Sequence, residues 1–122
     1  MKWFLIFVGG GLGSLIRHGI GIVSLRIWNT SFPIGTLITN TMACLVLGIL
    51  VYSILPKYAE YSWLSPLLIV GFCGGFSTFS TFGIETMNLF NLGNYLFALA
   101  NILISLIFGL GVLFFSQKVQ VY

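Results

Sequence analysis

The chain has 122 residues, of which 58% are hydrophobic and only 6% are charged, and its formal net charge is +3. A soluble domain carries about 25% charged residues, so this composition, with a mean hydropathy of +1.08, excludes an ordinary soluble domain and predicts an integral membrane protein. The 5 basic residues are spread over several loops. They are better explained as charges that set membrane topology than as a surface for nucleic acid.

The length predicts a single domain of about four transmembrane helices, because each span needs roughly 20 apolar residues. The expected spans cover about residues 3–25, 33–55, 64–89 and 95–115. Four short helices enclose little interior. If the function requires a larger bundle of helices, we expect the chain to form an oligomer. Cys44 and Cys73 fall inside two of these spans and form no CxxC pair, which favours small buried residues over a disulfide or a metal site.

The first expected span is rich in glycine and contains one charge. Gly9 and Gly13 form a GxxxG motif, which lets helix backbones approach closely and predicts tight packing. Arg17 lies deep in the span, where a charge costs about 2.5–3.5 kcal/mol. Its side chain must therefore face protein or water, or extend to the interface. The sequence leaves two roles open for Arg17: it anchors the structure, or it attracts anions.

Polar residues also interrupt the second and fourth spans. Thr36 and Asn40 are four residues apart, so they share one helix face. An asparagine in lipid is costly and normally faces a partner or a cavity, where its amide either bonds to a neighbouring helix or donates to a passing anion. An amide suits the second role because it is a neutral donor. Asn101 and Ser105 form a similar row, which fits small-residue packing or a polar track.

Residues 71–83, with the sequence GFCGGFSTFSTFG, combine glycines and hydroxyls inside an apolar segment. Gly74 and Gly75 weaken a helix, and unwound backbone is tolerated in a membrane only where protein or water covers it. We therefore expect the third helix to break over Gly74–Ser77, with these glycines unwound, and to line a pathway for a small ion.

Phenylalanines and hydroxyls follow the expected break. Phe79 and Phe82 share one face, and the positive edge of each ring can meet an anion, although a stripe of phenylalanines also fits a plain core. The neighbouring hydroxyls belong to Ser77, Thr78, Ser80 and Thr81. Glu85 follows about one turn after Phe82, and it either caps a polar vestibule or pairs with Arg17.

Three stretches of the chain match a known family in content and order. They read GGGLGSLIR at 9–17, FPIGTLITN at 32–40 and GFCGGFSTFSTF at 71–82. With these motifs the chain resembles the Fluc (CrcB) fluoride channels over essentially its full length. The resemblance implies an all-α integral membrane protein with four transmembrane helices and a break in the third, which assembles as an antiparallel, dual-topology dimer. It also implies two fluoride pores and a structural sodium ion at the dimer interface.

The matching positions assign the residues of the fluoride pore. By resemblance, Asn40 is the pore asparagine, and Phe79 and Phe82 are the two phenylalanines whose ring edges contact fluoride. In the family, the two phenylalanines of one subunit serve different pores. Thr36, on the same face as Asn40, and Thr81, beside Phe82, add hydroxyls to the predicted pore.

The same comparison predicts a sodium site and part of a polar track. Gly74 and Ser77 match positions whose backbone carbonyls hold the sodium ion, and a carbonyl ligand survives the presence of Ser77 in place of the usual threonine. Ser105 matches a hydroxyl on the polar track of the fourth helix. Asn101 and Gly109 depart from the side chains expected along that track.

The function implied is passive export of fluoride down its gradient, from the cytoplasm across the plasma membrane of a bacterium. No residue titrates or turns over during such conduction, so the chain is not expected to be an enzyme. If both termini lie on one side, the lysines there outnumber the arginine of the other side, which favours cytoplasmic termini. These residues are Lys2, Lys57 and Lys118 against Arg26. An antiparallel homodimer and a heterodimer with an oppositely inserted sister chain are both open.

Two other classes of membrane protein fit less well. A proton-coupled small multidrug exporter has a similar size but needs a carboxylate in its first helix, whereas the acids here are Glu60 and Glu85. A membrane scaffold protein would explain the GxxxG motif, but not Asn40 at depth or the glycines beside Phe79 and Phe82. The sequence therefore favours the channel.

Overall fold

The computed structural model describes residues 1–119, which form helices joined by short connections. The first helix is α1 (Lys2–Ile27), and the second is α2 (Ile34–Ile49), extended by the wider turns of a π-helix, η1 (Leu50–Ile54). The third begins with the π-helix η2 (Ser65–Cys73), continues as the short α3 (Gly74–Phe76) and, after an interruption, ends with α4 (Phe79–Asn91). The fourth is α5 (Tyr95–Val119).

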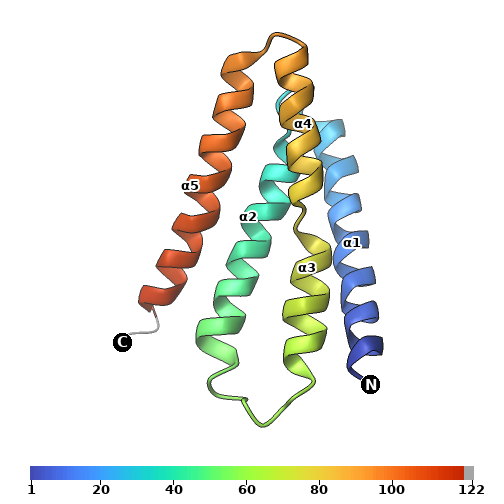
Figure 1. Ribbon diagram of the computed structural model, residues 1–122, viewed down its shortest axis with the longest axis vertical. Coiled ribbons are helices and arrows are strands. Elements are labelled where there is room, and N and C mark those ends of the chain that lie inside the picture. Colours follow the sequence, from blue (N-terminus) through green and yellow to red (C-terminus); the bar gives the residue numbers. More distant parts are fainter. Residues whose placement is uncertain (120–122) are drawn as a thin grey trace.

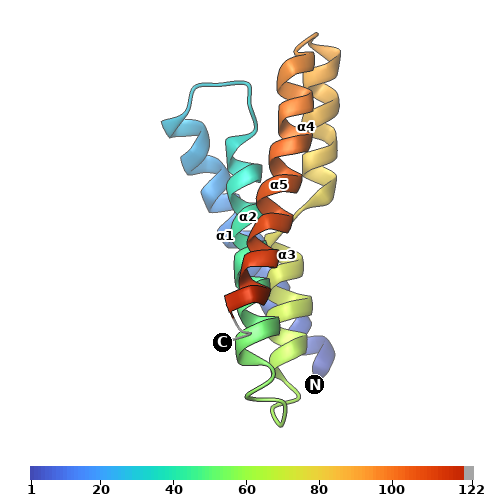
Figure 2. The same ribbon diagram turned by 90° about the vertical axis from the view of Figure 1, so that its left-hand side faces the viewer.

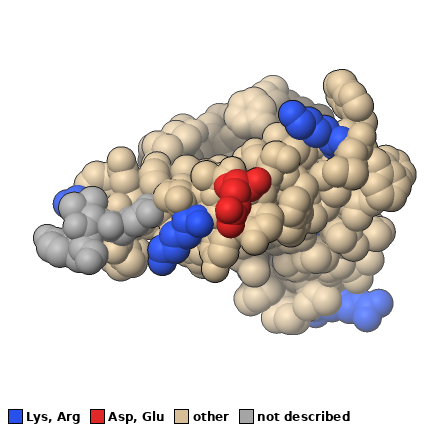
Figure 3. Space-filling model, turned by 90° about the horizontal axis from the view of Figure 1, so that it is seen from below, with Lys and Arg blue, Asp and Glu red and all other residues tan. Residues whose placement is uncertain are grey.

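All four helices are long and apolar enough to cross a membrane. This confirms the four predicted membrane spans and makes the chain a multi-pass membrane protein. In the view from below, the charged side chains are few, and most of the visible surface is uncharged (Figure 3). Large apolar side chains of α5, such as Leu103 and Phe108, are more than half exposed, as expected of a helix that faces lipid.

The helices form a thin bundle in which the first residues of α1, the connection 55–64 and the last turn of α5 lie at one end (Figure 1). α1 packs along η2 and α3, whereas α5 packs against α2 and α4. Figure 2 shows that the connection between α1 and α2 stands apart from the upper ends of α4 and α5. A cavity of about 200 Å³ lies between these two parts, lined on one side by Thr30 and Phe32 and on the other by Asn88 and Leu92.

The GxxxG motif of α1 packs against the third helix of the same chain. Gly9 and Gly13 are buried, and a Cβ on Gly9 would lie 2.9 Å from the Phe72 nitrogen and would also overlap the Leu67 carbonyl. A Cβ on Gly13 would lie 2.8 Å from the Phe76 nitrogen. The predicted tight packing is therefore confirmed, and it brings two backbone segments of one chain into contact.

The third helix is interrupted, but not at the predicted glycines. Gly74 and Gly75 belong to α3, and Gly74 has helical angles (φ −64°, ψ −37°). The prediction that they unwind is wrong, because Gly75 is a packing glycine: a Cβ there would lie 2.9 Å from the Gly10 Cα. The interruption lies at Ser77 (φ −79°, ψ 157°) and Thr78 (φ −152°, ψ 116°), which are both extended.

Candidate functional site

Asn40 on α2 pairs with the interrupted backbone of the third helix. The Thr78 N–H donates to Asn40 Oδ1 at 2.7 Å, and Asn40 Nδ2 donates to the Thr78 carbonyl at 3.1 Å. A primary amide carries a donor and an acceptor side by side. One side chain therefore satisfies both backbone groups of Thr78, which would otherwise be unpaired at membrane depth.

Each half of the interrupted helix is capped by side chains. Thr78 is the N-cap of α4, and its hydroxyl accepts from the Thr81 N–H at 3.2 Å, as N-cap side chains do. On the other half, the Gly75 carbonyl accepts from Ser14 Oγ at 3.3 Å and from Arg17 Nε at 3.1 Å. The last carbonyls of a helix lack donors from a next turn, so Arg17 anchors the end of α3 to α1.

Four of the predicted pore residues line one cavity between α2, α4 and α5. We call it the phenylalanine cavity; its volume is about 130 Å³, and its walls are Asn40, Cys44, Phe79, Phe82, Ser105, Leu106 and Gly109. The Phe79 and Phe82 ring centroids are 5.8 Å apart, and the rings are tilted by 37°. Phe79 is 84% exposed, so this chain leaves one side of the cavity open.

The other predicted pore residues line a second cavity, between α1, α2 and α4. We call it the vestibule; its volume is about 290 Å³, and its walls are Arg17, His18, Gly21, Ile22, Leu25, Gly35, Thr36, Thr39, Thr78, Thr81 and Glu85. Thr36 and Thr81 lie here and not in the phenylalanine cavity. Thr78 is a wall of the vestibule and bonds to Asn40, so this pair of residues lies between the two cavities.

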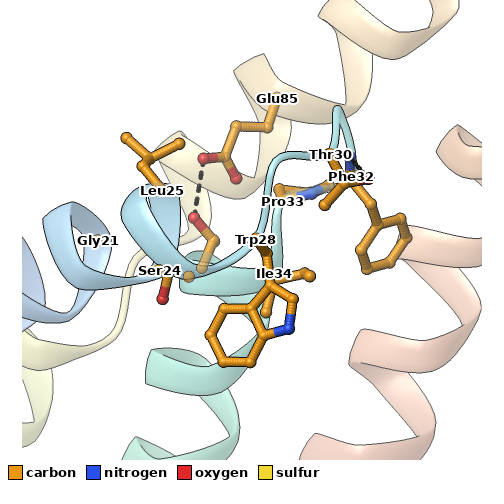
Figure 4. A pocket seen from close by; sticks show the side chains of 11 residues that line it. Gly21, Ser24, Leu25, Trp28, Thr30, Phe32, Pro33, Ile34 and Glu85 are labelled. Atoms are coloured by element: carbon orange, nitrogen blue, oxygen red, sulfur yellow. Dashed lines mark hydrogen bonds between the residues drawn. The ribbon is translucent and has the colours of Figure 1, made fainter.

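Arg17 and Glu85 both line the vestibule, but each bonds to a different partner. Glu85 Oε1 accepts from Thr36 Oγ1 at 2.9 Å, whereas Arg17 Nε donates to the Gly75 carbonyl. Figure 4 shows the Glu85 carboxyl with this hydrogen bond, on the wall of a neighbouring cavity of about 120 Å³ that Trp28 also lines. Glu85 Oε2 is buried and has no hydrogen-bond donor among residues 1–119. A buried acceptor without a donor is costly, so this carboxyl marks a position of functional interest.

Gly74 and Ser77, the predicted sodium ligands, line another cavity, of about 220 Å³. Gly74 is exposed, and a Cβ built on it would meet no atom within 4 Å. Ser77 Oγ donates to the Cys73 carbonyl at 2.9 Å, so the proton of this hydroxyl is already used. Both residues therefore face one open surface near the end of α3.

Two buried polar residues, Thr86 and Asn101, form a cross-link that sequence reasoning missed. Asn101 is 1% exposed, and its Nδ2 donates to Thr86 Oγ1 at 2.9 Å, which joins α5 to α4. Asn101 Oδ1 accepts from Ser105 Oγ, and Ser105 is a wall of the phenylalanine cavity. The available signal was a polar side chain in an apolar span, which needs a partner.

Comparison with known proteins identifies the family of this chain. The family described as CrcB-like protein, Camphor Resistance (CrcB), matches residues 4–117. The chain belongs to the CrcB family. A Coxiella burnetii protein named "Fluoride-specific ion channel FluC" is 43% identical to it over 107 residues, which are 86% of this chain and 86% of that relative. A Dehalococcoides mccartyi protein of the same name is 38% identical over 110 residues, which are 90% of this chain and 85% of that relative.

The match to the CrcB family covers every part of the site. A third relative, from Azobacteroides pseudotrichonymphae and also named "Fluoride-specific ion channel FluC", is 39% identical over 112 residues, 88% of this chain and 86% of its own length. The matched residues 4–117 include the break and the walls of both cavities. The family resemblance carried by the three motifs is therefore confirmed.

Proposed function

We propose that this chain is a subunit of a fluoride channel. The observation that carries the proposal is the phenylalanine cavity, where an amide, a hydroxyl and two aromatic rings meet beside a break in a membrane helix. N–H and O–H donors and ring edges attract an anion, and they do not hold it as a full positive charge would. The CrcB relatives named as fluoride-specific ion channels support fluoride as that anion.

The phenylalanine cavity supplies groups that replace the water around a small anion. An ion without compensating partners costs tens of kcal/mol in a medium of about the polarity of a dry protein. Asn40 Nδ2 has a second N–H beyond the one it gives to Thr78, and Ser105 adds a hydroxyl. Phe79 and Phe82 both line this cavity of about 130 Å³, and their ring edges add weak, neutral contacts. In the dimer that the resemblance implies, each of the two rings serves a different pore. Such a narrow site favours fluoride over the larger chloride.

The vestibule serves as the entry to this narrow site. Its hydroxyls, from Thr36 and Thr81, help to exchange water around the ion, and the positive charge of Arg17 raises the local concentration of anions. Conduction is passive, along the fluoride gradient, and it lowers the fluoride concentration in the bacterial cytoplasm by export across the cell membrane. No bond is made or broken in this process, so the chain acts as a channel and not as an enzyme.

A second chain must complete the pore. Phe79 is 84% exposed beside the cavity, and an ion that faced lipid tails there would lack partners. An antiparallel, dual-topology dimer covers the open side with a copy inserted the other way. The end of the bundle with the first residues of α1, the connection 55–64 and the last turn of α5 carries Lys2, Lys57 and Lys118, which favours its cytoplasmic placement. Because this bias favours one orientation, a heterodimer with an oppositely inserted sister chain is the alternative to a homodimer.

The carbonyls of Gly74 and Ser77 fit a structural sodium ion between the two chains. Half-helix ends and unwound backbone carbonyls coordinate sodium in membrane proteins, and both features lie at this point of the third helix. A carbonyl ligand does not depend on the side chain, so Ser77 serves as well as threonine. When bound, the ion would hold together the oxygens of two oppositely oriented chains.

The deciding experiment is ion efflux from liposomes that contain only this purified chain. Fluoride efflux measured with a fluoride electrode, without matching chloride efflux, is the result expected of a homodimeric channel. Efflux that appears only after co-reconstitution with an oppositely inserted sister chain would establish the heterodimer. No fluoride efflux from folded protein in either arrangement, or equally fast chloride efflux, would overturn the proposal.

A further inference from the structure

Asn101 is a buried amide one turn from the phenylalanine cavity. A buried amide is costly unless it is hydrogen-bonded, so its partners indicate what it does. Its Nδ2 donates to Thr86 Oγ1 at 2.9 Å, and its Oδ1 accepts from Ser105 Oγ at 3.4 Å. The amide therefore stands between the α4 helix and a hydroxyl of the cavity wall.

Thr86 sets the orientation of this amide. The Thr86 hydroxyl donates to the Phe82 carbonyl at 2.8 Å, and a hydroxyl has a single proton. Thr86 Oγ1 can therefore only accept from Asn101, which directs Nδ2 toward Thr86 and Oδ1 toward Ser105. The hydrogen bonds run in one direction, from the cavity hydroxyl to the backbone of α4.

Ser105 differs from three other hydroxyls in this chain. Each of these three hydroxyls donates to the backbone carbonyl four residues earlier, as serine and threonine in helices commonly do. The oxygen–oxygen distances are 2.9 Å for Ser77, 2.8 Å for Thr86 and 2.8 Å for Ser116. Ser105 instead donates to the Asn101 side chain at 3.4 Å, which exceeds about 3.0 Å, the upper end for O–H···O bonds. Its proton is therefore held weakly and away from the backbone.

We propose that Asn101 is a positioning residue of the anion pathway, which keeps the Ser105 proton available to an anion in the phenylalanine cavity. The inference rests on the proposed function. An ionised acceptor makes a stronger hydrogen bond than a neutral amide oxygen, so the weak bond to Asn101 is exchanged for a bond to the ion. Without Asn101, Ser105 donates to the carbonyl four residues earlier, as Ser77, Thr86 and Ser116 do, and the anion must displace a stronger bond.

The test is a double-mutant cycle of Asn101→Leu and Ser105→Ala, with fluoride efflux from liposomes as the readout. Leucine is similar in size to asparagine, and Thr86 keeps its bond to the Phe82 carbonyl, so no buried donor is left unpaired. In the wild-type background, Asn101→Leu is expected to lower efflux about tenfold, which is the lower end for one hydrogen bond to an ion. In the Ser105→Ala background, the same change is expected to alter efflux less than about twofold.

A matched control is Ser116→Ala, which removes a hydroxyl of the same helix that bonds to the Val112 carbonyl and is expected to leave efflux unchanged.

Equal losses from Asn101→Leu in both backgrounds would mean that Asn101 only clamps α5 to α4, and would overturn the proposal; full efflux in Asn101→Leu would do the same. If this variant does not reconstitute, Asn101→Ala is carried through the same cycle. Absence of fluoride efflux from the wild-type chain, alone and with a sister chain, would overturn the proposed function as well.

Discussion

The vestibule and the phenylalanine cavity lie on either side of the pair formed by Asn40 and Thr78, yet they are polar in different ways. The vestibule has a volume of about 290 Å³, and its walls include three ionisable side chains: Arg17, His18 and Glu85. The phenylalanine cavity has a volume of about 130 Å³, and its polar walls are the neutral groups of Asn40 and Ser105. Ionisable groups thus stand in the larger space, and neutral donors stand in the smaller one.

The difference follows from the cost of removing water from charges. A charged side chain in a wide cavity acts on ions through its field, over about 10 Å in moderate salt. In a narrow cavity, the same charge would be costly to bury or would bind a counter-ion too tightly for conduction. Neutral donors replace part of the hydration shell and release the ion again. Substitutions on either side of the break therefore test whether the cavities have separate roles.

The largest effect is expected from Gly13→Ala, because it forces α1 away from the third helix and removes the anchor of the break. A Cβ on Gly13 would lie 2.8 Å from the Phe76 nitrogen and would overlap the Phe72 carbonyl. Backbone atoms cannot avoid this overlap by rotating as a side chain can, so we expect the stability to fall by about 3 kcal/mol. Thermal unfolding and size-exclusion chromatography measure this loss. Gly11→Ala is the control, since a Cβ there meets nothing within 4 Å. Equal losses in both variants would contradict this packing.

Asn40→Leu is expected to abolish fluoride efflux and to destabilise the chain by an amount comparable to that of Gly13→Ala. It leaves the N–H and the carbonyl of Thr78 without their partner, at about 1–3 kcal/mol for each group, and it removes the amide donor from the narrow cavity. Efflux and thermal unfolding of the reconstituted variant measure the two effects.

The matched control is Thr36→Val, one turn away on the same helix. It removes a single hydrogen bond, to Glu85 in the vestibule, and is expected to lower efflux by less than about tenfold. If both variants lost efflux equally, the distinction between the narrow cavity and the wide one would fail.

Phe82→Leu is expected to lower fluoride efflux about tenfold while the protein keeps its fold. Leucine keeps the apolar bulk but lacks the positive ring edge, whose interactions contribute about 0.5–1.5 kcal/mol. Phe90→Leu is the control on the same helix, because Phe90 packs against Tyr95 with ring centroids 6.1 Å apart and lines neither cavity. Efflux through Phe82→Leu at the wild-type rate would remove ring edges from the mechanism.

Hydropathy and motif together predicted four membrane-spanning helices and the packing of Gly9 and Gly13, and four of the predicted pore residues line the phenylalanine cavity. They misplaced the break, because its position depends on Asn40, which is 38 residues away from Thr78 in sequence. Local glycine content favours a break at Gly74 and Gly75, but the backbone of α1 at Gly10 occupies the space where a side chain of residue 75 would lie. The contact between Asn40 and Thr78, which are far apart in sequence, therefore determines that the helix breaks at Ser77 and Thr78 and not at Gly74 and Gly75.

The division of the polar residues between two cavities was also beyond the sequence. Thr36 and Asn40 share a helix face by spacing, yet Thr36 bonds to Glu85 in the vestibule and Asn40 bonds across the break. Helical periodicity shows which residues share a face of a helix, but it does not show which residue of another helix lies beside each of them. The bond between Thr86 and Asn101 is hidden for the same reason, since it requires α4 and α5 to be placed side by side.

The smallest effects are expected from the charges of the vestibule, and they should have opposite signs. Glu85→Gln removes a negative charge and is expected to raise fluoride efflux up to about threefold at low salt, whereas the loss of positive charge in Arg17→Gln is expected to lower it by a similar factor. These charge effects should vanish as ionic strength rises from about 0.01 M to 1 M, because the screening length falls from about 30 Å to 3 Å. In Arg17→Gln, the lost bond to the Gly75 carbonyl adds a reduction that does not depend on salt. Efflux at several salt concentrations separates the two contributions. A change in Glu85→Gln that persists at high salt would mean that this side chain contacts the ion directly, and the vestibule would then act as a second binding site instead of an entry.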